Sequence, residues 1–407
     1  DELLDTSFFL EHREGGVRGN DEVGSSGLEA LWDRELRGAY GREVVTVDNR
    51  GRKKVKVVLD EIAPVHGRDI RTVLDLPLQT IVFEALKKRV EEDGIGKSGA
   101  AAVMDVSDER AGALLASAGV PGFDPDRPQD AEHALELKGR GGSFLDRPSR
   151  IPLYPGSVFK LVVATAALED STPWDPWRSF SCARTYRAGR KCSGSHGEIN
   201  LLRAIQASCN VYFYHLGDEI LAPATLRGWA TAFGYGLPVG MDPGPPGTAA
   251  GGAAGRLEDL DKRRPAATVQ DRCQYSIGQV HVEATPLQVL RSVAAVARGL
   301  RDLPRPYLVS RVAPDRFPQA HDREARARTV QVLHEGLWKA GHEPGGTAYK
   351  DTGDRRDAEV ARLHEWSAAF KTGTAERDAR DEKGRIVRDG AGDPVKVNIT
   401  WLVGFAP

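Results

Sequence analysis

Three short motifs of this chain contain the groups that acyl transfer through a serine requires. Ser157–Lys160 pairs a hydroxyl with an amine three residues later, Ser208–Asn210 adds a second hydroxyl and an amide, and Lys371–Thr374 reads Lys-Thr-Gly-Thr. Each motif alone occurs by chance in many chains of this length. Together, and in this order, they supply a nucleophile, a base, a proton relay and a strand that can bind a carboxylate.

Ser157 and Lys160 are the candidate nucleophile and base. At i and i+3 of a helix their side chains share one face, with Cβ atoms about 5–6 Å apart. Pro155-Gly156 precedes the helix, so Ser157 lies in a first turn where free N–H groups favour negative charge. Lys160 can accept a proton only when neutral, which burial or a second cation such as Lys371 would promote. The alternative is an N-cap serine beside a solvated lysine.

The second motif is expected to lie at a polar turn between two helices. Ser208 would relay a proton to the leaving amine, and Asn210 offers both a donor and an acceptor to a substrate amide. Cys209 would point behind the turn. The alternative for Asn210 is an ordinary helix C-cap.

The third motif is predicted to form an edge strand that lines the cleft. A peptide can add to such an edge through main-chain hydrogen bonds, and Gly373 leaves room for its backbone. Lys371 with the hydroxyls of Thr372 and Thr374 could hold a terminal carboxylate. The N–H groups of Ser157 and Thr374 could form an oxyanion hole, worth ~3–4 kcal/mol per donor. The alternative is a plain threonine-rich strand.

Composition restricts the possible classes of protein. A chain of 407 residues with 56 Lys and Arg against 58 Asp and Glu has room for two or three domains. The near balance of charge gives no indication of nucleic-acid binding. The apolar run 161–168 is far shorter than the ~18 residues of a membrane span.

Local patterns predict elements that would hold these motifs. Strands are expected at 44–48, 54–59, 100–106, 368–375 and 399–405, with 100–106 and 111–116 forming a hairpin. Helices are expected to begin at Pro77, Ser157, Asn200, Val211 and Thr285. Strands at both ends with helices between them predict an α+β domain, an antiparallel sheet sandwiched by helices. We place a domain boundary near Ser98, giving domains 1–97 and 98–407.

The chain resembles the class B penicillin-binding proteins, and among them the elongation-type, penicillin-binding protein 2 group. The resemblance extends over nearly the whole chain. Its runs are Ser26–Ala30, Leu36–Gly38, Gly67–Asp75, Tyr154–Ser157, Ser208–Tyr214, Tyr275–Gln279, Lys371–Glu376 and Trp401–Pro407. It implies that 1–97 is part of a non-catalytic pedestal (dimerisation-like) domain and that 98–407 is a transpeptidase domain similar to serine β-lactamases.

This chain departs from the family pattern at three places. Family members have a cytoplasmic tail and an N-terminal membrane helix, and they continue beyond the Gly-Phe-Ala-Pro segment into a strand and a C-terminal helix. We therefore expect the chain to be truncated at both ends. In addition, Phe370 occupies the position before Lys-Thr-Gly where the family has glycine.

The resemblance implies a peptidoglycan D,D-transpeptidase that cross-links D-Ala-D-Ala stem peptides through an acyl-enzyme on Ser157 and is acylated by β-lactams. It implies a place at the periplasmic face of the inner membrane, and a SEDS-type glycosyltransferase with other elongation proteins as partners. Rival enzymes are a D,D-carboxypeptidase or a serine β-lactamase, although ~150 residues before the nucleophile exceed what a small hydrolase needs. A rival without turnover is a β-lactam sensor or a structural activator of a glycosyltransferase.

A second cluster comprises Cys182, Cys192, His196 and Cys209. Three thiols and an imidazole are a possible tetrahedral zinc set, although their spacing is irregular. Some relatives in the elongation group are similar in holding zinc with a histidine and a cysteine at the positions of His196 and Cys209. The alternative is a Cys182–Cys192 disulfide. We favour zinc in a structural role, with no cofactor needed for the chemistry.

Overall fold

The computed structural model divides the chain into two compact units, which we describe separately. The smaller unit comprises residues 1–72 and 242–250, and the larger comprises 73–241 and 251–407. The structure describes residues 21–24, 27–47, 53–92, 98–122, 145–239, 252–309, 314–318, 323–349, 367–379 and 385–406. Ser26, Asp48, Lys97 and Pro407, at the ends of segments predicted above, lie outside these ranges.

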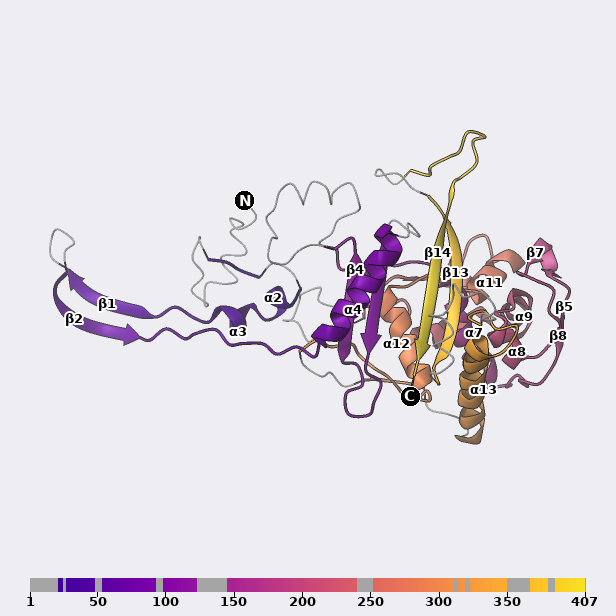
Figure 1. The fold of residues 1–407 in the computed structure, drawn as a ribbon, viewed down its shortest axis with the longest axis horizontal. Helices are drawn as coiled ribbons and strands as arrows, with labels where there is room; N and C mark the ends of the chain where they lie inside the picture. Colours follow the sequence, from indigo (N-terminus) through magenta and orange to yellow (C-terminus); the bar gives the residue numbers. More distant parts are fainter. Residues whose placement is uncertain are drawn as a thin grey trace. The chain divides into compact units, whose positions relative to one another are not determined.

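The smaller unit contains two short helices and a strand pair. Helices α2 (Gly27–Leu31) and α3 (Asp33–Arg37) precede β1 (Arg42–Val47) and β2 (Lys53–Ile62). The two strands are antiparallel, with Arg42 opposite Ile62 (Figure 1). Their valine-rich sequences favour a β conformation. The strand predicted at 54–59 is confirmed, and so is the one predicted at 44–48 as far as Val47, the last of its residues that the structure describes.

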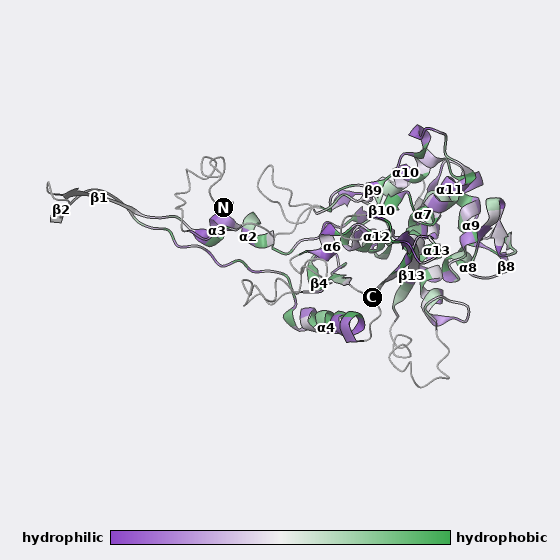
Figure 2. Ribbon diagram, turned by 90° about the horizontal axis from the view of Figure 1, so that it is seen from above, coloured by the Kyte–Doolittle hydropathy of each residue, from purple (hydrophilic) through white to green (hydrophobic). Residues whose placement is uncertain are grey.

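In the larger unit, helix α4 (Leu76–Lys87) packs on the hairpin of β3 (Gly99–Met104) and β4 (Leu114–Val120). The Asp75 side chain accepts a hydrogen bond from the backbone N–H of Leu78, 3.0 Å away, and so caps the helix. Hydrophobic and hydrophilic residues alternate around α4 in Figure 2, as expected for a helix with one packed face. The contacts join α4 to the larger unit, while the domain boundary at 97/98 stays a prediction.

A second strand pair carries the third motif. β13 (Ala369–Asp378) runs antiparallel to β14 (Lys396–Phe405), with Lys371 opposite Val403. Helix α13 (Arg323–His342) packs on β13, and α12 (Pro286–Ala297) contacts both β14 and β3. Thr285 and Gln288 form a capping box at the start of α12, so this helix begins where the sequence predicts.

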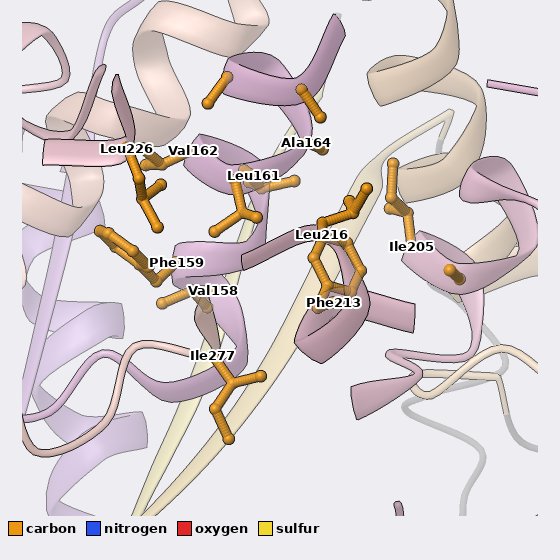
Figure 3. Close-up of a cluster of buried hydrophobic side chains, with 14 of the residues drawn as sticks. Val158, Phe159, Leu161, Val162, Ala164, Ile205, Phe213, Leu216, Leu226 and Ile277 are labelled. Atoms are coloured by element: carbon orange, nitrogen blue, oxygen red, sulfur yellow. The ribbon is translucent and has the colours of Figure 1, made fainter. Parts of the chain in front are cut away.

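The core surrounds the helix that follows the candidate nucleophile. All ten residues of α7 (Lys160–Glu169) are buried, because the helix is apolar on every side apart from its terminal charges. Helices α8 (Leu201–Gln206), α9 (Asn210–His215) and α10 (Pro223–Ala232) supply side chains to this core (Figure 3). Burial on all sides fixes the position of α7.

Short elements complete the larger unit. They are α6 (Arg147–Arg150), β5 (Phe180–Cys182), β6 (Thr185–Tyr186), β7 (Arg190–Lys191), β8 (Gly197–Ile199), β9 (Arg256–Leu257), α11 (Val269–Ser276), β10 (Val282–Glu283), β11 (Asp302–Leu303) and β12 (Asp315–Arg316). Among the described residues, every sheet consists of two strands, and the two strands of each sheet are antiparallel. In the part of the chain that the structure describes, no helix has both the length and the apolar character needed to cross a bilayer.

Candidate active site

The candidate nucleophile lies in a tight turn at the start of α7. Gly156–Phe159 form one turn of 3-10 helix, and the α-helix begins at Lys160. With three residues per turn, positions i and i+3 eclipse each other, so Ser157 and Lys160 share a face more closely than in an α-helix. Ser157 is half-buried, whereas Lys160 is fully buried. Both residues thus lie at the edge of the core, and their roles as nucleophile and base stay a prediction.

The amine of Lys160 is held by the second motif. Its Nζ donates to the backbone oxygen of Ser208 at 2.8 Å and to Oδ1 of Asn210 at 2.7 Å, and it lies 3.2 Å from Oγ of Ser208. The Phe213 ring centroid is 5.3 Å from Nζ. Burial lowers the pKa of Lys160 from 10.5 to about 8, against an opposing effect of the nearby cysteines. The neutral fraction that can accept a proton near neutral pH is therefore much larger than that of an ordinary lysine.

The second motif forms the turn between α8 and α9. Ser208 has a positive φ of 52°, which reverses the chain directly after α8 and orients its hydroxyl to the lysines. Cys209 is fully buried behind the turn, as predicted, and Asn210 begins α9. Because a left-handed conformation is uncommon for a residue other than glycine, the contacts on both sides of the turn must hold it.

The Ser208 hydroxyl lies between the amines of two lysines. Nζ of Lys371 is 2.8 Å from Oγ of Ser208 and donates to the backbone oxygen of Thr372 at 2.8 Å. Burial, and then the charge of Lys160, lower the pKa of Lys371 well below its usual range. Lys160, Ser208 and Lys371 form a continuous hydrogen-bonded chain that can pass a proton in either direction.

Strand β13 places the third motif, Lys371–Thr374, next to the 3-10 turn that contains Ser157. Along the strand Lys371 and Gly373 are buried, Thr372 is half-buried and Thr374 is exposed. A Cβ atom on Gly373 would lie 3.1 Å from the Pro155 backbone oxygen, so the glycine makes room for the nucleophile turn. The expected room for a substrate backbone stays a prediction. Thr372 and Thr374 carry the hydroxyls that are accessible to a carboxylate.

Gly156 brings the turn close to Thr374. It has a φ of 55°, and a Cβ atom there would lie only 2.6 Å from the backbone oxygen of Thr374. Only glycine can adopt this conformation at this distance without displacing the strand. The backbones of Ser157 and Thr374, the two predicted oxyanion donors, are neighbours for this reason.

Two residues that were not predicted, Thr347 and Gln206, link the third motif to its surroundings. Oγ1 of Thr347 lies 2.6 Å from Oγ1 of Thr372, and the Thr347 backbone N–H donates to the oxygen of Gln206 at 3.3 Å. Nε2 of Gln206 in turn donates to the oxygen of Pro344 at 3.2 Å. The segment after α13 thus links α8 to β13. Neither residue belongs to a motif, so no local signal could have identified them.

The structure explains the phenylalanine that precedes Lys371. A Cβ atom on Gly341 would lie 2.7 Å from the Phe370 ring, and one on Gly404 would lie 2.9 Å from it. The ring therefore lies in a slot between two glycines, one on α13 and one on β14. Filling this slot joins the helix and both strands around Lys371.

The predicted metal ligands come together behind the turn Ser208–Asn210. The ligand atoms of Cys182, Cys192, His196 and Cys209 all lie within 4.8 Å of one another. Nδ1 of His196 is 3.4 Å from the sulfur of Cys182 and 3.5 Å from that of Cys192, whose sulfur is 3.9 Å from that of Cys209. All four cysteines of the chain are free thiols. Each sulfur of the cluster is buried, and His196 is half-buried.

The cluster is joined to the turn Ser208–Asn210 through the backbone of that turn. The N–H of Asn210 donates to the sulfur of Cys192 at 3.2 Å. The hydrogen bond shared with Cys209 lowers the pKa of Cys192 and raises that of Cys209. Any group bound by these sulfurs would therefore act on the position of Asn210 and, through it, on the partner of Lys160.

Known families match both units of the chain. Residues 99–407 match the family described as Penicillin binding protein transpeptidase domain, and residues 9–72 match the Penicillin-binding Protein dimerisation domain. The Peptidoglycan D,D-transpeptidase MrdA of Escherichia coli strain K12 is 27% identical over 353 residues, which cover 81% of this chain and 52% of the relative. The Probable peptidoglycan D,D-transpeptidase PenA of Neisseria meningitidis is 27% identical over 399 residues, which cover 95% and 58%. The chain spans about half the length of these curated relatives.

Solved structures share the fold. PBP2 of Helicobacter pylori, in a complex with MreC, aligns with a TM-score of 0.74 at 23% identity over 98% of this chain and 68% of that chain. PBP2 of Pseudomonas aeruginosa, in complex with WCK 5153, aligns with a TM-score of 0.67 at 22% identity over 96% and 77%. The predicted fold, a pedestal domain followed by a transpeptidase domain, is confirmed.

Proposed function

The chain belongs to the penicillin-binding protein transpeptidase family, as a class B member of the elongation type, and from this premise we propose that it is a peptidoglycan D,D-transpeptidase. Its substrates would be stem peptides that end in D-Ala-D-Ala, and β-lactams would acylate the same serine. The observation that carries the proposal is the hydrogen-bonded chain Lys160–Ser208–Lys371 beside the turn of Ser157.

In the acylation step Ser157 would attack the carbonyl carbon of the penultimate D-Ala. Its proton passes to the neutral amine of Lys160 as the new C–O bond forms. The backbone N–H groups of Ser157 and Thr374 stabilise the oxyanion. Collapse of the tetrahedral intermediate breaks the C–N bond, and the departing D-Ala amine takes a proton delivered through Ser208.

In the second step an amine from a neighbouring stem peptide would attack the acyl-enzyme. The acceptor amine gives up a proton along the same chain of groups, and Ser157 regains its proton as it leaves. Thr372 and Thr374 hold the substrate carboxylate, whose negative charge favours the protonated form of Lys371 on the buried side of the strand. The net reaction exchanges one amide bond for another, which needs no cofactor.

Two other outcomes remain open to experiment. Hydrolysis of the acyl-enzyme by water would make the protein a D,D-carboxypeptidase or a β-lactamase. A stable penicillin adduct without any cross-linked product would indicate a sensor or a structural activator. The deciding experiment supplies lipid-linked peptidoglycan precursor with a glycosyltransferase and analyses the products for cross-linked peptides.

Covalent labelling with penicillin tests the site itself. Intact-mass and peptide analysis should find one adduct, at Ser157, in the wild-type protein. Ser157→Ala should remove all labelling with an unchanged melting temperature, because Ser157 is only half-buried and its hydroxyl is small. Labelling that persists in Ser157→Ala would refute the assignment of the nucleophile.

Membership of the family supports a location and a set of partners for this protein. We place the protein at the periplasmic face of the inner membrane, with residues 1–97 as a pedestal and 98–407 as the transpeptidase domain. The complex of the Helicobacter pylori relative with MreC supports an MreC-like protein as a partner of this chain, with a role in cell elongation and cell shape. A SEDS-type glycosyltransferase is proposed as a further partner. Co-purification with each candidate from a membrane fraction tests these assignments.

We further propose that Cys182, Cys192, His196 and Cys209 bind a structural zinc ion. With Zn–S bonds of about 2.3 Å and a Zn–N bond of about 2.0 Å, tetrahedral edges are about 3.8 Å between two sulfurs and about 3.5 Å between sulfur and nitrogen. The observed separations of 3.9, 3.4 and 3.5 Å fit these values. Four protein ligands leave no position for water, so the ion would stabilise the Ser208–Asn210 turn.

Metal analysis of protein purified without chelators tests the zinc proposal. About one zinc ion per chain is expected, with a lower melting temperature after chelation and slower acylation in Cys209→Ser. Cys273→Ser is the matched control, because Cys273 is also buried but is not one of the clustered ligands. Absence of metal together with a Cys182–Cys192 disulfide in a peptide map would refute it.

A further inference from the structure

The segment between α11 and α12 (residues 277–285) is hydrogen-bonded to residues 153–156, which directly precede Ser157. The backbone oxygen of Gly278 accepts a hydrogen bond from the N–H of Gly156 at 2.9 Å. Further along, Leu153 and Ala284 exchange two backbone hydrogen bonds of 2.9 and 2.8 Å. A Cβ atom on Gly278 would lie 2.5 Å from the oxygen of Gly156, so the two turns are in direct contact. The path of residues 278–284 therefore sets the position of the residue before the nucleophile.

His281 anchors this segment from its middle. The imidazole is 3% exposed, with Nδ1 2.7 Å from Oε2 of Glu258 and Nε2 3.1 Å from Oδ1 of Asp271. Each ring nitrogen therefore faces a carboxylate oxygen within hydrogen-bonding distance. Nε of Arg263 lies 3.2 Å from Glu258, and the same guanidinium contacts Asp271. The ring is thus held between the residue after β9 and the first turn of α11.

Val280 takes a conformation that its neighbours must impose. Its φ is 59°, in the left-handed region where β-branched residues are genuine outliers. The side chain is 40% exposed, so its own packing does not account for the conformation. This strain persists only if the residues on both sides are held in place, here by the Gly278 contact and by His281.

We infer that His281, clamped between Glu258 and Asp271, is a positioning residue that keeps the strained turn at Val280 in place and thereby holds Gly278 against Gly156, the residue before the nucleophile. His281 contacts neither Ser157 nor the two lysines and acts only through this backbone. As a statement about the reaction, the inference rests on the proposed function. The structural claim, that His281 keeps the hydrogen bond between Gly156 and Gly278 in place, does not depend on that function.

The test combines penicillin acylation with amide hydrogen exchange. In His281→Gln we expect acylation of Ser157 to slow at least about 10-fold, because small misplacements of reacting groups are costly. Exchange across residues 153–160 should become faster. Glu258→Gln, a milder change at a side chain that is 29% exposed, should shift both readouts in the same direction if His281→Gln fails to fold.

Arg298→Gln is the matched control. Arg298 is 8% exposed, and its Nε is 2.6 Å from Asp302, so its loss should also lower the melting temperature. Its contacts do not reach the turn at Ser157, so acylation and exchange at 153–160 should stay at wild-type values. Equal effects of Arg298→Gln and His281→Gln would overturn the inference.

A second substitution tests the role of strain. Glycine adopts a φ of 59° without steric cost. Adding Val280→Gly to the His281→Gln variant should therefore restore part of the acylation rate that His281→Gln loses. No restoration, or wild-type acylation in His281→Gln, would overturn the inference. If the wild-type protein takes up no penicillin, the proposed function fails instead, and exchange at residues 153–160 still decides the structural part.

Discussion

Acylation of Ser157 is expected to accelerate as the pH rises from 7 to 9, because its base must lose a proton first. Burial in the core lowers the pKa of Lys160 from 10.5 to about 8. A general base acts in its deprotonated form, so the rate follows the neutral fraction of this amine. Below the pKa the rate should rise with pH, and above it the rate should level off.

The magnitude follows from the pKa. At a pKa of about 8 the neutral fraction is ~9% at pH 7 and ~90% at pH 9, an increase of ~10-fold. An ordinary lysine with a pKa of 10.5 would be only ~0.03% neutral at pH 7. Burial therefore raises the active fraction by a factor on the order of 10²–10³ at neutral pH, equivalent to about 3 kcal/mol.

The assay is the second-order rate of labelling by penicillin from pH 6 to 10, with circular dichroism to check that the protein stays folded. Lys371→Met should lower the rate but leave the midpoint within about one pH unit, because burial is the largest cause of the shift in Lys160. A rate that is flat or falls between pH 7 and 9 would refute Lys160 as the base. A large displacement of the midpoint in Lys371→Met would show that the second lysine sets the pKa.

Three further predictions concern single side chains. Gly404→Ala should destabilise the protein by ~1–3 kcal/mol in denaturant unfolding, since its Cβ would lie 2.4 Å from the oxygen of Ala369 and 2.9 Å from the Phe370 ring. Gly228→Ala should instead stabilise it by ~0.5–1 kcal/mol, because this exposed glycine lies within α10 and no atom lies within 4 Å of the added Cβ. Thr347→Val removes the 2.6 Å hydroxyl contact to Thr372 and should weaken binding of carboxylate-bearing β-lactams by ~0.5–1.5 kcal/mol. The melting temperature should change little. Unchanged binding would argue against a role for that contact.

Local rules explain what could be predicted for the fold. Thr285 and Asn200 cap helices where the sequence places their starts, since capping depends on residues only three positions apart. The strands that carry Lys371 and its neighbour were recognisable from runs of apolar and β-branched residues. The 3-10 turn at Ser157 was not foreseen, but it preserves the i, i+3 relation to Lys160.

Residue types and their short spacings are enough to identify a candidate nucleophile, a candidate base and a set of thiols. How those groups meet depends on the folded chain: the Ser208 hydroxyl lies between Lys160 and Lys371, which are 48 and 163 residues away from it in sequence. The slot of Phe370 and the clamp of His281 likewise join segments that no local pattern relates. Such contacts depend on how the helices and strands pack around α7, and packing is a property of the whole core.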